Sequence, residues 1–404
     1  MTTPNKSTAF MGPFIDEGIR VIDMDSHWTE PPDLWTSRAP AKYRDRVPKF
    51  VPGDNGAAHW AVDGVPFYFL EANAVVNANG DKIPGILSLP FEEVDRGAYE
   101  PKARLKVLDR LGISQQIIYP NVAGFGSTNF MKVQDSELRR LCAATWNDAA
   151  LEVQAEGEDR LFPQAVVPFW DVEYAVEELK RVRGLGITGI TMCSEPEAFG
   201  LPYLDEEHWD TFWATCQDLQ VAVNFHIGGG TDAFTRTPWK SMARKHPQRR
   251  LAVGSIGLFI DNFRVIINLI YSGLLERFPT LKFVSVESGI GWIPFVLEAA
   301  DYQFEETCPD DREGLTLKPS EYFRRQIFAS FWFEDFGPRN VIPLVGEDNV
   351  MFETDYPHPT CLYPGAQEHI IDVLSDLEPR VRRKVLQDTA AKLYGLPPAP
   401  AIRA

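Results

Sequence analysis

The 404-residue sequence contains only five cysteines, and no two of them are spaced as C-x-x-C. Five scattered cysteines in a chain of this length do not suggest a disulfide framework, and the lack of C-x-x-C spacing argues against a thiolate zinc site. Residues 1–15 also lack the basic start and apolar run of a secretory signal. Together these absences predict a reduced, cytoplasmic setting.

Positive charge is scarce as well. Asp and Glu number 57 against 40 Lys and Arg, which gives a formal net charge of -17. Nucleic acids and anionic membrane surfaces attract proteins through clustered Lys and Arg, so neither is expected as a partner. The most apolar stretch, residues 251–275, contains charged and amide side chains and is expected to be buried in the protein, because a bilayer span needs an unbroken apolar run.

Short apolar runs rich in β-branched residues recur along the chain and alternate with segments of helical periodicity. This alternation predicts an α/β protein with a parallel sheet covered by helices, and eight repeats predict a closed (β/α)8 TIM barrel formed by one domain over residues 1–404. An open doubly wound sheet is the alternative, but the G-x-G-x-x-G turn that would favour it is absent. The expected strands are 21–25, 116–119, 164–167, 187–191, 221–225, 282–286, 326–329 and 349–352, and the expected helices are 103–111, 136–156, 172–183, 206–219, 263–278, 293–304 and 380–393.

Two stretches interrupt the alternation. Residues 36–100 are too many for a loop between a strand and a helix, and residues 59–69 within them predict a hairpin with an Asp-Gly turn. Residues 228–256, which begin with three glycines, predict a long loop after the fifth strand. Both follow strands, so in a barrel they would wall the pocket at its C-terminal mouth. Residues 397–404 are rich in Pro and Ala and predict a frayed tail.

Residues that can bind a metal stand at the ends of three expected strands. Asp25 and His27 close the first strand, and side chains two residues apart on a strand share a face. His226 closes the fifth strand and Asp355 the eighth. Each residue alone is more often structural, but all four meet at the mouth of one barrel. Imidazole and carboxylate together are typical ligands of divalent metals, so the four predict a metal site.

Two further residues are candidates for catalysis beside Asp355. Glu287 ends the sixth strand, where it can act as a general acid or base next to a metal-bound water, or form a purely structural bond to a neighbouring loop or an arginine. His358 follows Asp355 by three residues and either orients that carboxylate or contacts the substrate.

Several stretches resemble amidohydrolase-related barrels of the aminocarboxymuconate semialdehyde decarboxylase type. Ile22-Asp23-Met24-Asp25-Ser26-His27 is similar to the I-D-x-H-x-H motif of that family, and residues 105–113, 272–282, 354–358 and 390–396 match as well. The resemblance spans residues 20–397. It implies that Asp25, His27, His226 and Asp355 bind one divalent metal, in agreement with the choice made from the residues.

The sequence departs from this family at two positions. Asp25 stands where the decarboxylases have a His, and a harder oxygen ligand makes manganese or magnesium more competitive with the expected zinc. Glu287 stands where they have a His that handles the metal-bound water or the substrate proton.

The leading hypothesis is non-oxidative decarboxylation of a small aromatic or unsaturated carboxylic acid bound against the metal. Hydrolysis by a metal-activated water, with Glu287 as the base, is the alternative, and a non-catalytic ligand-binding barrel is a third. The expected partner is a small organic acid. Members of the resembled family often form dimers, which leaves a homodimer open.

Overall fold

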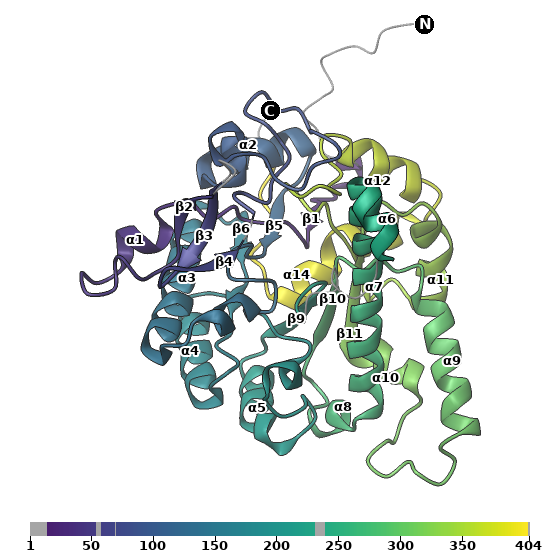
Figure 1. Cartoon of the computed structure of the whole chain (residues 1–404). Coiled ribbons are helices and arrows are strands. Elements are labelled where there is room, and N and C mark those ends of the chain that lie inside the picture. The colour runs from purple at the N-terminus through teal and green to yellow at the C-terminus, as the bar shows by residue number, and fades with distance from the viewer. Residues whose placement is uncertain (1–13, 54–57, 69, 231–238, 403–404) are drawn as a thin grey trace, which may run out of the picture.

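A parallel β-barrel forms the centre of the computed structural model, which describes residues 14–53, 58–68, 70–230 and 239–402 (Figure 1). The strands form two ladders, β1-β5-β6 and β7-β8-β9-β10-β11-β12, and all neighbouring pairs are parallel. The strands are β1 Ile22–Asp23, β5 Gln115–Ile118, β6 Leu161–Pro163, β7 Ala165–Val166, β8 Gly189–Thr191, β9 Ala222–His226, β10 Phe283–Val286, β11 Ile327–Phe331 and β12 Val350–Phe352.

Two connections join the ladders into a closed ring. Only Gln164 separates β6 from β7, so the two form one strand interrupted at that residue. At the other seam the amide of Met24 donates to Phe352 O at 2.9 Å, and the amide of Asp355 donates to Asp25 O at 3.0 Å. β1 therefore lies beside β12, which confirms the predicted (β/α)8 barrel against the open sheet.

Helices cover the outside of the barrel (Figure 1), and their ends follow ordinary capping signals. Asp135 caps α3 by accepting a hydrogen bond from Glu137 N at 3.0 Å. Helix α2 begins at Pro101 and is capped after Leu111 by Gly112, which has φ 70°. The helices are α2 Pro101–Leu111, α3 Ser136–Glu156, α4 Val172–Gly184, α5 Asp210–Asp218, α7 Pro247–Tyr271, α8 Leu274–Arg277, α9 Ile293–Glu306, α10 Pro319–Gln326, α11 Ile342–Val345, α12 Ala366–Leu374, α13 Pro379–Arg383 and α14 Thr389–Tyr394.

Helix α14 closes the end of the barrel opposite the mouth. Ala390 and Tyr394 pack with barrel-interior side chains such as Ile22, Val284 and Met351 in one apolar cluster. Tyr394 also donates from Oη to the side chain of Asn224 in β9 at 2.7 Å. The plug leaves the C-terminal mouth as the open end of the barrel, which is where active sites of this architecture form.

The insertion between β1 and β5 contains a small antiparallel sheet. The order is β2 Lys49–Pro52, β3 Ala58–Val62 and β4 Val65–Tyr68, and helix α1 Leu34–Arg38 precedes the sheet. Asp63 and Gly64 both have positive φ, 51° and 76°, as the tight turn between β3 and β4 requires. The predicted hairpin is therefore confirmed, except for residue 69, which lies outside the described residues. The first strand, β2, was not predicted.

The prediction of a long loop over 228–256 is wrong for its second half. Residues 231–238 lie outside the described residues, but α6 Lys240–Lys245 follows them and α7 begins at Pro247. Pro247 occupies the first turn, where its missing N–H costs nothing. The charged side chains of this region indicated a loop, yet they lie on exposed turns of helix.

Helix α7 passes the strand ends and continues beyond them. The amide of Asn262 donates to Phe225 O at 2.9 Å and to Val286 O at 3.1 Å, so the middle of the helix lies level with the mouth. α7 is long and apolar enough, by length and composition alone, to cross a membrane, but about half of its most apolar window is buried, and buried core helices pass the same test.

Candidate metal centre and active site

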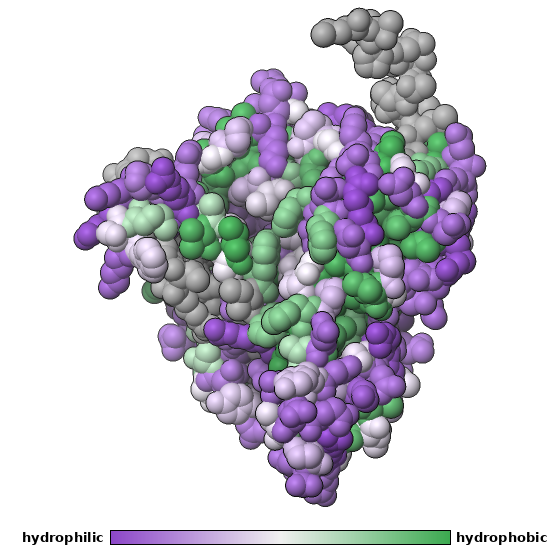
Figure 2. Space-filling view, turned by 90° about the vertical axis from the view of Figure 1, so that its right-hand side faces the viewer, coloured by the Kyte–Doolittle hydropathy of each residue, from purple (hydrophilic) through white to green (hydrophobic). Residues whose placement is uncertain are grey.

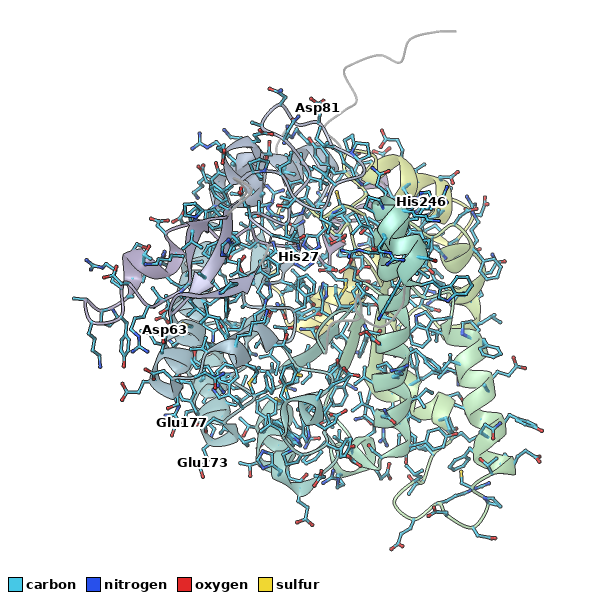
Figure 3. The ribbon with its side chains drawn as sticks, viewed as in Figure 1. His27, Asp63, Asp81, Glu173, Glu177 and His246 are labelled. Atoms are coloured by element: carbon cyan, nitrogen blue, oxygen red, sulfur yellow. The ribbon has the colours of Figure 1, made fainter. Side chains whose placement is uncertain are left out.

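The four predicted metal-binding side chains converge at the mouth of the barrel. His27 Nε2 lies 3.1 Å from His226 Nε2 and 3.6 Å from both Asp25 Oδ1 and Asp355 Oδ1. His226 Nε2 lies 3.4 Å from Asp25 Oδ2. All four side chains are fully buried. His27 lies at the centre of the molecule in Figure 3, whereas His246, between α6 and α7, lies well away from it.

Strand geometry explains this convergence. Beyond the end of β1 the backbone continues beside its neighbours, with Ser26 paired to Tyr356 and His27 paired to Tyr119. Asp25 and His27 therefore share the inner face, while Ser26 turns outward and donates to Ile117 O at 2.8 Å. His226 is the last residue of β9.

The carboxylates of the cluster lack the hydrogen-bond donors that burial demands. Neither oxygen of Asp25 has a hydrogen-bond donor among the described residues. Asp355 Oδ1 has the ring of His358 beside it, with Nδ1 at 2.9 Å but not aligned as a full hydrogen bond. Burial, followed by the charges of Asp355 and Asp23, raises the pKa of Asp25 well above its ordinary value. A buried carboxylate without donors is costly unless a cation or a proton neutralises it, so a divalent cation fits this site.

The two histidines have the protonation that a metal needs. His226 Nδ1 lies 2.8 Å from Ile227 O and His27 Nδ1 lies 3.3 Å from Pro120 O, which places a hydrogen on each Nδ1 and leaves each Nε2 with a lone pair. Burial lowers the pKa of His226 to about 4. Burial, together with the neighbouring His358 and His226, also lowers the pKa of His27 well below its ordinary value. Two neutral Nε2 lone pairs that face each other at 3.1 Å repel unless a cation lies between them.

Glu287 belongs to the same cluster. Its Oε2 lies 3.2 Å from His226 Nε2, and one ligand atom each from Asp25, His27, His226 and Glu287 lie within 4.8 Å of one another. Burial, then Asp355 and Asp25, raise the pKa of Glu287 well above its ordinary value, which favours the protonated carboxyl. The sequence predicted Glu287 beside the metal, and the geometry makes it a candidate ligand as well as an acid or base.

The turn that presents Glu287 is held in a strained form. Glu287 has φ 57°, in the left-handed region that non-glycine residues rarely adopt, and Asp355 has φ 59°. Glu334 supports the turn, because its carboxylate accepts from Ile290 N at 3.0 Å and from Gly291 N at 2.8 Å. Two strained residues beside a cluster of ionisable groups are typical of a functional site.

His358 completes the cluster predicted from the sequence. Its Nδ1 lies 2.9 Å from Asp355 Oδ1, and its ring stacks on that of His27 with centroids 3.6 Å apart. Its Nε2 faces two amides, Asn121 Oδ1 at 2.8 Å and Asn73 Nδ2 at 2.9 Å. Of its two predicted roles, these contacts favour the orientation of Asp355.

A buried polar layer beneath the cluster was not predicted. Asp23 accepts from Asp25 N at 3.2 Å, from Thr354 N at 2.8 Å and from Gln116 Nε2 at 2.8 Å. Arg104, also buried, donates to Gln116 Oε1 at 3.1 Å and to the carbonyl of His27. Asp23 lies two residues before Asp25 and therefore shares its face of the strand, which was the one sequence signal for this layer. Gln116 and Arg104 gave no such signal, because they look like ordinary strand and helix residues.

An aromatic ring covers the histidines from the loop after β5. The centroid of Phe125 lies 4.3 Å from His226, 4.9 Å from His27 and 5.7 Å from His358, and the ring is half-buried. Gly228 allows this approach, since a Cβ there would lie 3.3 Å from the Phe125 ring. Phe125 therefore forms an apolar wall beside the four predicted metal-binding residues.

Comparisons with known proteins agree with this arrangement. The profile of the amidohydrolase family matches residues 22–396. The chain is 24% identical over 311 residues to the 2-amino-3-carboxymuconate-6-semialdehyde decarboxylase of Dictyostelium discoideum, covering 76% of this chain and 80% of that relative. It is 26% identical over 265 residues to the gamma-resorcylate decarboxylase of Rhodococcus jostii (strain RHA1), covering 63% of this chain and 76% of the relative. The predicted family resemblance is confirmed.

Solved structures share the fold. An amidohydrolase from Mycobacterium avium subsp. paratuberculosis K-10 superposes with a TM-score of 0.71 at 21% identity, covering 93% of this chain and 99% of its own. The 5-carboxyvanillate decarboxylase of Novosphingobium aromaticivorans DSM 12444, complexed with manganese and 4-hydroxy-3-methoxy-5-nitrobenzoic acid, has a TM-score of 0.65 at 16% identity, covering 98% of this chain and 100% of its own.

Proposed function

The chain belongs to the amidohydrolase family, and we propose that it is a metal-dependent carboxy-lyase that removes CO2 non-oxidatively from a small aromatic or unsaturated carboxylic acid. One observation carries the proposal: two neutral His Nε2 atoms face each other at 3.1 Å beside an Asp25 carboxylate without donors. The decarboxylase names of both relatives support the reaction.

We propose Asp25, His27, His226 and Asp355 as the ligands of one divalent metal. The bound manganese of the Novosphingobium enzyme supports a divalent ion in this fold. Zinc is the identity expected from the family resemblance, while the oxygen atoms of Asp25, Asp355 and Glu287 suit manganese or magnesium. Elemental analysis of the purified protein, followed by reconstitution with each ion, decides among the three.

The metal and the residues around it have different roles in the proposed reaction. When bound, the metal supplies positive charge that anchors a substrate carboxylate or a neighbouring oxygen. Glu287 Oε2 is placed to hold the proton that is delivered to the carbon bearing the carboxylate. Cleavage of the C–C bond then releases CO2, and the new C–H bond keeps the proton. Phe125 presents an apolar ring for a flat substrate and excludes water from that side.

The test is CO2 release from hydroxylated benzoates and unsaturated dicarboxylates by metal-loaded protein. We expect turnover of at least one acid, its loss on chelation, and its recovery when the metal is restored. His226→Ala should lose activity and metal together, while His246→Ala, an exposed histidine away from the cluster, should keep both. Hydrolysis of the matching amides or esters without CO2 release would replace the lyase with the hydrolase in which Glu287 is the base.

The quaternary structure is a separate prediction. Figure 2 views the side that carries α7, α9 and α12 and shows apolar side chains gathered on it. Contiguous apolar patches are rarely left uncovered on monomers, which supports a homodimer. Light scattering during gel filtration should give twice the monomer mass. The exposed large apolar side chains of α7, α9, α11, α12 and the segment after β11 are Val253, Ile256, Phe295, Tyr302, Phe333, Phe336, Leu344 and Ile371.

A further inference from the structure

One residue of the insertion reaches the cluster from outside the barrel. Asn73 is buried, with 7% of its surface exposed, and its Nδ2 lies 2.9 Å from His358 Nε2 and donates to Asn121 Oδ1 at 3.3 Å. Asn121 stands in the loop after β5 and His358 in the loop after β12, so three separate segments meet at one imidazole nitrogen.

Hydrogen bonds hold the backbone on both sides of Asn73. Ser88 Oγ accepts from the amides of Ala72 and Asn73 at 3.1 Å each, and Thr29 Oγ1 donates to Ala72 O at 2.9 Å. Two residues later, Val75 N donates to Pro357 O at 3.0 Å, directly before His358. The segment is therefore anchored both to the loop after β1 and to the loop that carries Asp355 and His358.

The backbone of Asn73 also adopts a conformation that few residues tolerate. Its φ is 48°, in the left-handed region, where Asn is among the few side chains that are tolerated. A strained residue persists only where its surroundings hold it, and here the strain directs an amide at His358. With Asn73 Nδ2 as a donor and Asn121 Oδ1 as an acceptor, His358 Nε2 has a partner in either tautomer of the ring.

We propose that Asn73 is a positioning residue of the metal centre: its amide fixes the ring of His358, which in turn holds Asp355 Oδ1 at 2.9 Å. The proposal rests on the metal centre proposed above, because Asp355 is one of its ligands. By this proposal the insertion between β1 and β5 contributes a positioning residue to the site in addition to lining the mouth of the barrel. Residues that hydrogen-bond a metal ligand, or the group that holds it, without touching the metal orient that ligand and raise the affinity for the metal.

The test measures Mn²⁺ binding to chelator-stripped protein by calorimetry, which needs no substrate. Asn73→Gly removes the side chain without backbone strain, because Gly adopts positive φ freely. We expect roughly a 10-fold loss of Mn²⁺ affinity. Asn79→Gly, at an exposed position of the same insertion, is the matched control and should bind like the wild type. Asn73→Ser should repeat the loss if the glycine variant does not fold.

A double-mutant cycle separates positioning from general destabilisation. If Asn73 acts through His358, Asn73→Gly should cause no further loss of Mn²⁺ affinity in a His358→Ala background. Losses that multiply in the double variant, or Mn²⁺ binding of Asn73→Gly equal to that of Asn79→Gly, would overturn the proposal. Wild-type protein that binds no Mn²⁺ and no Zn²⁺ would overturn it together with the metal centre. Metal binding without decarboxylation would refute only the proposed reaction.

Discussion

Glu30 is a buried carboxyl whose ionisation should shape the pH dependence of stability. It stands three residues after His27, and its Oε1 accepts from Asn121 N and Val122 N at 3.0 Å each and from Trp146 Nε1 at 2.9 Å. Its Oε2 has no donor among the described residues. Burial raises the pKa of Glu30 from 4.5 to about 7, although these three donors oppose the shift.

The sign of the effect follows from proton linkage. Between pH 4.5 and 7 the folded protein keeps a proton on Glu30 that the unfolded chain has already released. The free energy of unfolding therefore falls as pH rises through this window, by about 3 kcal/mol in total, and stays at the lower level above it. Below pH 4.5 both states are protonated, and Glu30 contributes no penalty.

Glu30→Gln should remove this penalty, because an amide of the same shape accepts at the same oxygen and does not ionise. For a chain of this length, the melting temperature of the variant should rise above that of the wild type by a margin that grows by about 3 °C from pH 5 to pH 8, from the average unfolding entropy per residue. Calorimetric melts of both proteins at several pH values measure it. Glu156→Gln, at an exposed position, is the control. A difference in melting temperature between the wild type and Glu30→Gln that stays constant across this pH range would refute the assigned ionisation.

Four further predictions concern the site and the barrel. Asp25→Asn should weaken Mn²⁺ binding by more than the roughly 10–100-fold typical of outer partners, measured by calorimetry; unchanged affinity would remove Asp25 from the ligand set. Saturating metal at 100 times its dissociation constant should stabilise the stripped protein by about 2.7 kcal/mol in denaturant melts, and no shift would contradict a preformed site. Phe125→Ala should raise KM for aromatic acids more than it lowers kcat, since the ring faces the site beside His226; an equal effect on aliphatic acids would contradict a stacking role. Gly189→Ala should destabilise the fold by about 1–3 kcal/mol, because its Cβ would lie 2.0 Å from Gln164 Oε1, and a neutral result in urea melts would show that Gln164 moves aside.

The barrel and the positions of its predicted metal-binding residues could be predicted from the sequence, because both depend on local patterns. Alternating strand and helix periodicity predicts the parallel ladder, and parallel strands present their carboxyl ends at one mouth. His226 ends β9, and Asp25, His27 and Asp355 follow the ends of β1 and β12 within four residues, so the sequence places them together before any distance is known.

The region after β9 shows where local patterns mislead. Charged side chains over residues 240–250 indicated a loop, although helices accept charged residues on an exposed face as readily as loops do. The start of α7 at Pro247 did carry a local signal, because proline is favoured in the first turn of a helix, but the polar composition of the region outweighed it.

The sequence by itself therefore determined the barrel, the family and the strand ends near which the predicted metal-binding side chains lie. Only the tertiary structure decided that Glu287 enters the ligand cluster, that Phe125 covers the histidines, and that Asn73 reaches His358 from 285 residues away in the chain. Periodicity reports the neighbours of a residue along one element. Contacts between an insertion and two distant loops depend instead on how those segments pack across the mouth, and no spacing in the sequence encodes that packing.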